Sequence, residues 1–146
     1  MVSETISIER SLLNSEAFRR LSSTAKTVYF DFKMKCRVEE IKNKKGRKSS
    51  WRIKNNGELI YTYVEAMNKS PKITRPAFTR ALDNLIEHGF IDVAHSGAGG
   101  RKGDKSMYAI SHRWRKWGTN EFVEVIRQKD TRQGRGFAVY WKNKNR

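Results

Sequence analysis

The sequence predicts a single α+β domain that is mainly helical and carries basic extensions, and three observations predict this class. Two stretches with apolar residues at three- and four-residue steps are typical of amphipathic helices. Two shorter stretches rich in β-branched and aromatic residues are typical of strands, and a glycine-rich segment between them favours a hairpin. The 146 residues suit one domain. We expect it to span 12–117, with an N-terminal extension over 1–11 and a basic C-terminal extension over 118–146.

The first part of the predicted domain contains two helical segments. Asn14 or Ser15 can cap a short one within 12–21, because side-chain oxygens accept hydrogen bonds from free helix N–H groups. A longer helix begins near Ser22 and extends over 23–38. Its apolar stripe, which we expect to face the core, comprises Ala25, Val28, Tyr29, Phe32 and Cys36.

A basic segment without apolar periodicity follows over 42–55. We expect an exposed basic loop here, with a hairpin tip near Gly46 as one form it could take. The dipeptide Asn56-Gly57 is a strong turn signal. Leu59 to Tyr61 then favours a short strand leading into the next helix.

A short helix is predicted to begin after Thr62. Glu65, three residues on, completes the capping-box pattern. We expect Val64 and Met67 to face inward. The helix ends at Ser70-Pro71, because the residue before proline is pushed out of the α region.

A longer helix is predicted from Thr74 to His88. Thr74 can cap it, Pro76 is compatible with its first turn, and Gly89 stops it. Its buried stripe comprises Phe78, Ala81, Leu82, Leu85 and Ile86. Its outward face comprises Arg75, Thr79, Arg80 and Asp83.

Two strands and a basic loop are predicted after this helix. Phe90 to Val93 and Met107 to Ile110 have strand composition, and the glycine- and lysine-rich loop over 97–105 joins them. A short helix bearing Trp114 and Trp117 follows, and we expect these rings to lie in the core or at an interface.

The charge of the chain favours a polyanionic partner. It has 31 Lys and Arg residues against 15 Asp and Glu residues, a net charge of +16, which indicates nucleic acid first and an anionic membrane surface second. The single cysteine, Cys36, cannot form an internal disulfide. No signal peptide and no apolar run of about 20 residues is present, so we expect a cytoplasmic protein outside the membrane.

The predicted order of helix, turn, helix, strand, basic loop and strand is that of a winged helix-turn-helix with a two- or three-stranded wing sheet. In such domains the second helix enters the major groove of DNA and the loop contacts the backbone. Arginine can donate two hydrogen bonds to guanine. The candidate reading residues are Thr74, Arg75, Thr79 and Arg80. The candidate backbone contacts are Arg101, Lys102 and Lys105 in the wing and Lys44, Lys45, Arg47 and Lys48 in the basic loop. An amphipathic helix with a solvated face and a solvated hairpin loop are the alternatives.

The basic segment 127–146 contains Phe137, Tyr140 and Trp141 among its charges. These rings could stack on unpaired bases, or pack on the domain or on a second subunit. The preceding stretch, 121–126, fits a helix or a strand.

The sequence gives no positive evidence of an enzyme. His88, His95 and His112 lack metal-ligand spacing with each other or with Cys36. The run GAGGRKGDKS lacks the spacing of a phosphate-binding P-loop, and no catalytic triad arrangement can be argued. We therefore expect no catalysis, no cofactor and no metal.

Three runs, FRRLSSTAKTVYFDF, NNGELIYTYVEA and ITRPAFTRALDNLIEHGFIDV, resemble the winged-helix domains of plasmid and phage replication proteins and related mobile-element regulators. The likeness covers about 12–117. It implies binding to double-stranded DNA through the Thr74 to His88 helix and the wing, in transcription regulation or in DNA replication. Many such initiators use two winged-helix domains, whereas this chain has room for one, so no origin-opening or nicking activity is implied.

Two hypotheses from other classes remain beside DNA binding. The same positive surface could bind structured RNA or a ribosome through shape and phosphate contacts. A protein-interaction module using its tryptophans is the third hypothesis, and a homodimer is compatible with each of them.

Overall fold

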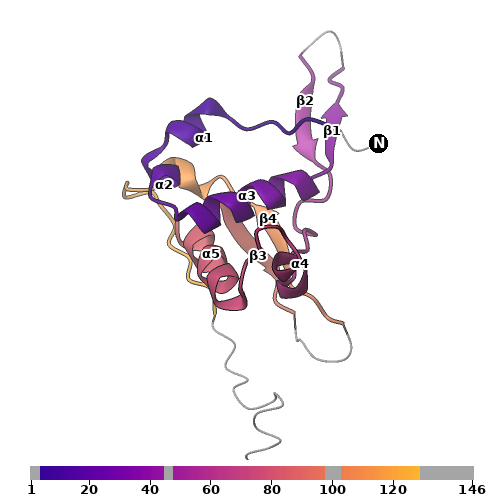
Figure 1. Cartoon of the computed structure of the whole chain (residues 1–146). Coiled ribbons are helices and arrows are strands. Elements are labelled where there is room, and N and C mark those ends of the chain that lie inside the picture. The colour runs from indigo at the N-terminus through magenta and orange to yellow at the C-terminus, as the bar shows by residue number, and fades with distance from the viewer. Residues whose placement is uncertain (1–3, 45–47, 98–102, 129–146) are drawn as a thin grey trace, which may run out of the picture.

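The computed structural model describes residues 4–44, 48–97 and 103–128. Within these ranges, five α-helices and two small antiparallel two-stranded sheets form an α+β body (Figure 1), which confirms the expected class at this level. The helices are α1 (Arg10–Asn14), α2 (Glu16–Arg19), α3 (Ser23–Lys35), α4 (Tyr63–Met67) and α5 (Arg75–Glu87). The strands are β1 (Val38–Ile41), β2 (Ser50–Ile53), β3 (Ile91–His95) and β4 (Met107–Ile110), followed by the 3-10 helix η1 (Arg113–Lys116).

Four of the five α-helices begin where the sequence places a capping hydroxyl. In each of them the side-chain oxygen accepts a hydrogen bond from the backbone N–H three residues later, which satisfies a group that lacks an intrahelical partner. These caps are Ser15, Ser22, Thr62 and Thr74. Ser15 itself has an extended backbone, so α1 and α2 are two short helices that meet at this residue.

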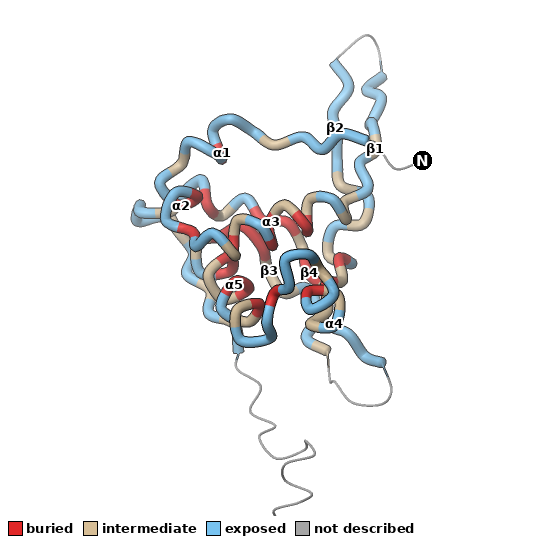
Figure 2. The backbone as a smooth tube through the Cα atoms, in the orientation of Figure 1, coloured by how far each residue is buried: buried red, intermediate tan, exposed pale blue. Residues whose placement is uncertain are grey.

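The core lies between α3, α5 and the β3–β4 sheet (Figure 2). All five apolar residues expected on the inner side of α5 are buried, and so are four of the five expected on α3, with Cys36 half-buried. Aromatic rings connect the elements: Phe32 contacts Tyr108 at 5.3 Å between centroids, and Tyr61 stacks on Phe78 at 4.8 Å. The two predicted stripes therefore form the packed centre of the molecule.

The inward residues of α4 were predicted wrongly. Val64 is 68% exposed and Met67 is 41% exposed, whereas Ala66 is fully buried. A helix of five residues has room for one small buried side chain here, because Tyr63 already fills the space against Phe78. The capping pattern predicts where the helix begins but not which of its side chains face the core.

The basic loop expected over 42–55 is partly a β-hairpin. Val38 pairs with Ile53 and Ile41 pairs with Ser50, and the expected tip at Gly46 lies outside the described residues. The preceding helix, expected over 23–38, ends at Lys35 instead. Asn55 explains this early end, because it accepts the backbone N–H of Arg37 and donates to the carbonyl of Lys35.

The turn at Asn56-Gly57 is confirmed, with Gly57 at φ +89°. Asn56 also acts as a strand partner, since its side chain exchanges two hydrogen bonds with the backbone of Ile110 on β4. The strand expected over 59–61 is reduced to one bridge, between Leu59 and Tyr108. The β3–β4 sheet is therefore extended by one bridged residue, Leu59, and not by a full third strand.

The chain after β4 folds back onto α5. The guanidinium of Arg113 donates to the carbonyls of Ile86 and Val123 and to the carboxylate of Asp92. The bond to Val123, together with a hydrogen bond from Arg127 to Asp83 on α5, holds the segment 118–128 beside α5 (Figure 1). Its stretch 121–126, for which the sequence allowed a helix or a strand, is neither.

Candidate nucleic-acid interface

Helix α5 presents two arginines outward. Because its apolar residues are buried on one side, Arg75 and Arg80 are exposed on the other side. Among the described residues neither arginine forms an ion pair. The first two turns of α5 therefore carry two positive charges that are available to an anionic partner.

Tyr63, the first residue of α4, holds this end of α5. The Arg75 guanidinium lies 4.7 Å from the centre of the Tyr63 ring, a cation–π contact. The Thr79 hydroxyl donates to the Tyr63 hydroxyl at 3.2 Å, and the ring meets Phe78 edge-on at 5.3 Å. Thr79 is half-buried. This expected reading residue therefore also connects α5 to α4 through its hydrogen bond with Tyr63.

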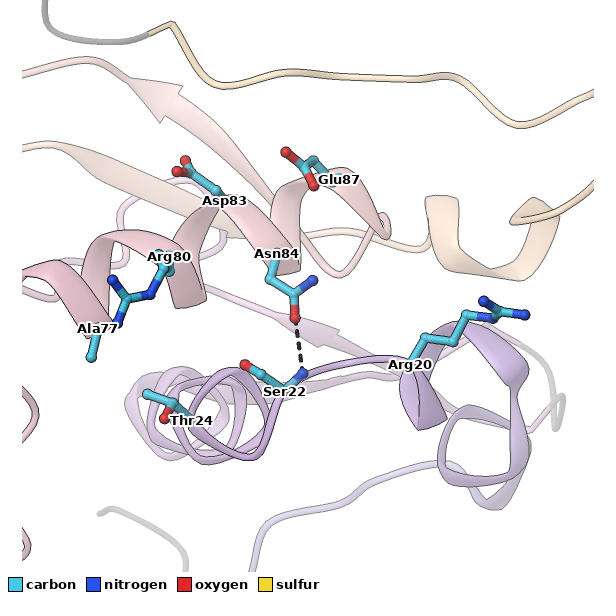
Figure 3. Close-up of a pocket in the computed structure, with 8 residues that line it drawn as sticks. All are labelled: Arg20, Ser22, Thr24, Ala77, Arg80, Asp83, Asn84 and Glu87. Carbon is cyan, nitrogen blue, oxygen red and sulfur yellow. Dashed lines mark hydrogen bonds between the residues drawn. The ribbon is translucent and has the colours of Figure 1, made fainter.

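A shallow hollow of about 450 Å³ lies between α5 and the start of α3 (Figure 3). Arg80 lines it from α5 and Thr24 from α3, and the Ser22 N–H donates to the Asn84 side chain at 3.0 Å across its floor. Arg20 lies at its far end, paired with Glu16. The hollow is open and lined mainly by side chains of polar and charged residues, Asp83 and Glu87 among them, which suits contact with a large hydrated surface better than enclosure of a small molecule.

Asp83, the carboxylate expected on the outward face of α5, is neutralised. The Arg127 guanidinium lies 2.6 Å from its carboxylate oxygen. Burial disfavours the charge on Arg127, but its hydrogen bond with Asp83 and their mutual attraction outweigh the burial and raise the pKa of Arg127. Sequence reasoning missed this pair, because no local signal joins residues that lie so far apart along the chain.

The loop between β3 and β4 is closed at its base. His95 Nε2 lies 2.8 Å from an Asp104 carboxylate oxygen, and the Gly97 N–H donates to the Ser106 hydroxyl. Lys105 is exposed beside these contacts. The other two expected wing cations, Arg101 and Lys102, lie outside the described residues.

The basic hairpin and the β3–β4 loop lie at opposite ends of the body. Figure 1 shows the β1–β2 hairpin at one end and α4 with the β3–β4 loop at the other. Lys44 and Lys48 are exposed on the hairpin, whereas Lys45 and Arg47 lie outside the described residues. The structure therefore brings Arg75 to α4 through its contact with Tyr63, whereas the basic hairpin lies at the other end of the body.

The described part of the chain shows no cluster of three or more His, Cys, Asp or Glu side chains that could hold a metal ion. In the same residues no helix has the length and apolar character needed to cross a membrane. Burial raises the pKa of the Cys36 thiol, which donates to the Phe32 carbonyl at 3.4 Å. This cysteine therefore behaves as a half-buried packing residue.

Comparisons of the chain with protein-family models, with curated proteins and with solved structures found no match.

Proposed function

We propose that this protein is a non-enzymatic, winged helix-turn-helix protein that binds double-stranded DNA. In this proposal α5 lies in the major groove, and the β3–β4 loop contacts the adjacent backbone. The observation that carries the proposal is the outward face of α5, where Arg75 and Arg80 have no carboxylate partner within the described part of the chain and Asp83 is neutralised by Arg127.

The arrangement of the elements supports the winged-helix assignment. The helices α4 and α5 are separated by the short segment 68–74 and pack on each other, α5 also packs on α3, and an antiparallel hairpin follows α5 directly. In this assignment the bridge from Leu59 to Tyr108 corresponds to a third wing strand reduced to one residue pair. Groove binding requires a helix with an exposed face and a basic loop on one small core, so this order of elements supports the proposal.

The contacts of Tyr63 support a reading role for α5. A reading helix whose first side chains are already ordered loses less conformational entropy when DNA binds. Tyr63 restrains Arg75 and Thr79 from α4. In the proposal Arg80 contacts a base edge, Arg75 contacts the DNA beside it, and Lys105 contacts a phosphate.

The biological role proposed is transcription regulation or replication of a mobile element. The resemblance of the three sequence runs to plasmid and phage replication proteins supports it. The net charge of +16 supports strong electrostatic attraction to DNA, which in such proteins falls steeply as salt is raised.

The first experiment selects preferred sequences from a random duplex pool and, in parallel, from a structured RNA pool. Enrichment of a duplex motif is the expected result. Arg80→Ala should then weaken binding to the selected duplex by about 1–3 kcal/mol more than binding to random duplex, because base contacts carry the sequence information. Fluorescence anisotropy at fixed salt measures both affinities.

Two variants serve as controls for Arg80→Ala. Lys105→Ala should weaken both duplexes to a similar extent, as a phosphate contact does. Arg10→Ala removes the same charge from an exposed site on α1 and should change either affinity little. Enrichment of RNA alone, or equal losses on both duplexes for Arg80→Ala, would contradict the reading role of α5.

A further inference from the structure

The β1–β2 hairpin exposes a large aromatic ring. Trp51 is 67% exposed and lies opposite Glu40 in the register of the two strands. Because side chains two apart on a strand share a face, Trp51 lies on the same face as Val38 and Ile53. Ile53 packs against the core, whereas Val38 is 56% exposed, so this apolar face leads outward from the body and ends at Trp51.

The hairpin that carries this ring has an excess of positive charge, although Glu40 lies opposite Trp51 itself. The hairpin segment from Arg37 to Lys54 contains eight Lys or Arg residues and two Glu residues, an excess of six cations. One of the two glutamates, Glu39, is paired with Arg52. Lys44 and Lys48 are exposed without an ion-pair partner in the described structure. The hairpin therefore combines an accessible aromatic face with an excess of cations.

This combination favours nucleic acid over a second copy of the chain as the occupant. Two copies of the hairpin would bring together segments of the same strong positive charge, and this repulsion opposes pairing. A nucleic-acid strand supplies phosphates for the lysines and a base for the ring. Stacking of bases on aromatic side chains within a basic groove is the general way in which proteins bind unpaired strands.

The position of the hairpin makes it a separate site. It projects from the end of the body opposite α4 and the β3–β4 loop (Figure 1), and almost its whole length is exposed (Figure 2). A duplex held by α5 and the β3–β4 loop would therefore leave Trp51 free. We propose that the β1–β2 hairpin is a second nucleic-acid site, in which an unpaired base stacks on Trp51 while Lys44 and Lys48 contact the flanking phosphates.

The test compares single-stranded and duplex binding in the full chain. A short fluorescent oligothymidylate and the selected duplex are titrated with wild type, Trp51→Ala and Trp51→Phe. Trp51→Ala should weaken binding to the oligothymidylate about tenfold, the effect of one lost stacking contact, and leave duplex binding unchanged. Trp51→Phe should retain most of the single-strand affinity, because phenylalanine keeps a stacking face.

Two controls separate this site from the duplex site. Val38→Ala shortens an exposed apolar side chain on the same face without removing a ring, and it should leave single-strand binding unchanged. Arg80→Ala should lower duplex affinity and spare the oligothymidylate, so the two sites can fail independently. Circular dichroism and light scattering verify that each variant keeps the fold and the oligomeric state of the wild type.

Three results would overturn the second site. The first is Trp51→Ala binding the oligothymidylate as wild type does. The second is an equal loss on the duplex, which would place the hairpin in the same site as α5. The third is a fall in molecular mass on substitution, which would make the Trp51 face a contact between copies of the chain.

Discussion

Single polar side chains join segments of this protein that are distant along the chain. Asn55 links the end of α3 to the base of the hairpin, and Asn56 pairs with Ile110 on β4. Each amide offers a donor and an acceptor, so it can replace the backbone partner that a bend in the chain removes. At Asp83 and Arg127 a similar long-range contact changes the charge of the proposed DNA-binding face.

The pair of Asp83 and Arg127 gives a prediction at the residue scale. Arg127→Ala should weaken binding to the selected duplex about threefold to tenfold at low salt, because the Asp83 carboxylate on α5 would then lack its partner and repel phosphate. The loss should shrink as salt is raised. Anisotropy titrations at two salt concentrations measure both effects.

Asp83→Asn in the Arg127→Ala background separates two roles of the arginine. If Arg127 acts by neutralising Asp83, the double variant should recover most of the lost affinity. A double variant that binds as weakly as Arg127→Ala would show that Arg127 contacts DNA itself.

At the scale of elements, the junction from α5 through β3 to η1 depends on one glycine. Gly89 has φ +83°, and a Cβ atom there would lie 2.6 Å from the backbone nitrogen of Trp114. That nitrogen donates to the Gly89 carbonyl, so η1 sits directly on the turn that ends α5. The close approach requires the absence of a side chain.

Gly89→Ala should lower the free energy of unfolding by more than about 2 kcal/mol, because it combines an unfavourable backbone conformation with a backbone clash. Gly118→Ala is the matched control. Gly118 has φ +81°, but no atom lies within 4 Å of its added Cβ, so the backbone term of about 1–2 kcal/mol is isolated. Urea unfolding of both variants measures the difference, and equal losses would show that the clash relaxes at little cost.

Local signals account for the elements that the sequence predicted well. The caps at Ser22, Thr62 and Thr74 and the apolar stripe of α5 depend on residues three or four positions apart. The rotation of α4, the hairpin strands and the pairing of Arg127 with Asp83 depend on contacts between distant segments. For the candidate site, the exposure of Arg75 and Arg80 followed from the helical period, whereas the restraint by Tyr63 had no local signal.

At the scale of the whole molecule, three buried tyrosines make the stability of the fold depend on pH. Tyr29, Tyr61 and Tyr108 are each no more than 5% exposed. Burial raises the pKa of each above the ordinary value of 10.0, and for Tyr61 the hydrogen bond to the buried Asp31 carboxylate raises the pKa further. The folded protein therefore keeps these hydroxyls protonated at a pH where the unfolded chain loses the protons.

Stability should consequently be fully present below pH 10 and fall as pH rises above it. Above the pKa that tyrosine has in the unfolded chain, each of the three tyrosines lowers the free energy of unfolding by roughly 1 kcal/mol per pH unit. The reason is that the folded state keeps a proton that the unfolded state releases. Urea unfolding across alkaline pH measures this slope. Tyr29→Phe should make it shallower, and ionisation of all three tyrosines at pH 10 in the folded protein, seen as tyrosinate absorbance, would contradict the account.

The segment 118–128 is attached to the body through Arg127, which donates to Asp83, and through the Val123 carbonyl, which accepts from Arg113. Because the second attachment does not involve Asp83, Arg127→Ala removes the ion pair while the Arg113 bond still holds the segment. A change in duplex affinity in that variant therefore reports the charge on α5 and not a release of the segment from the body.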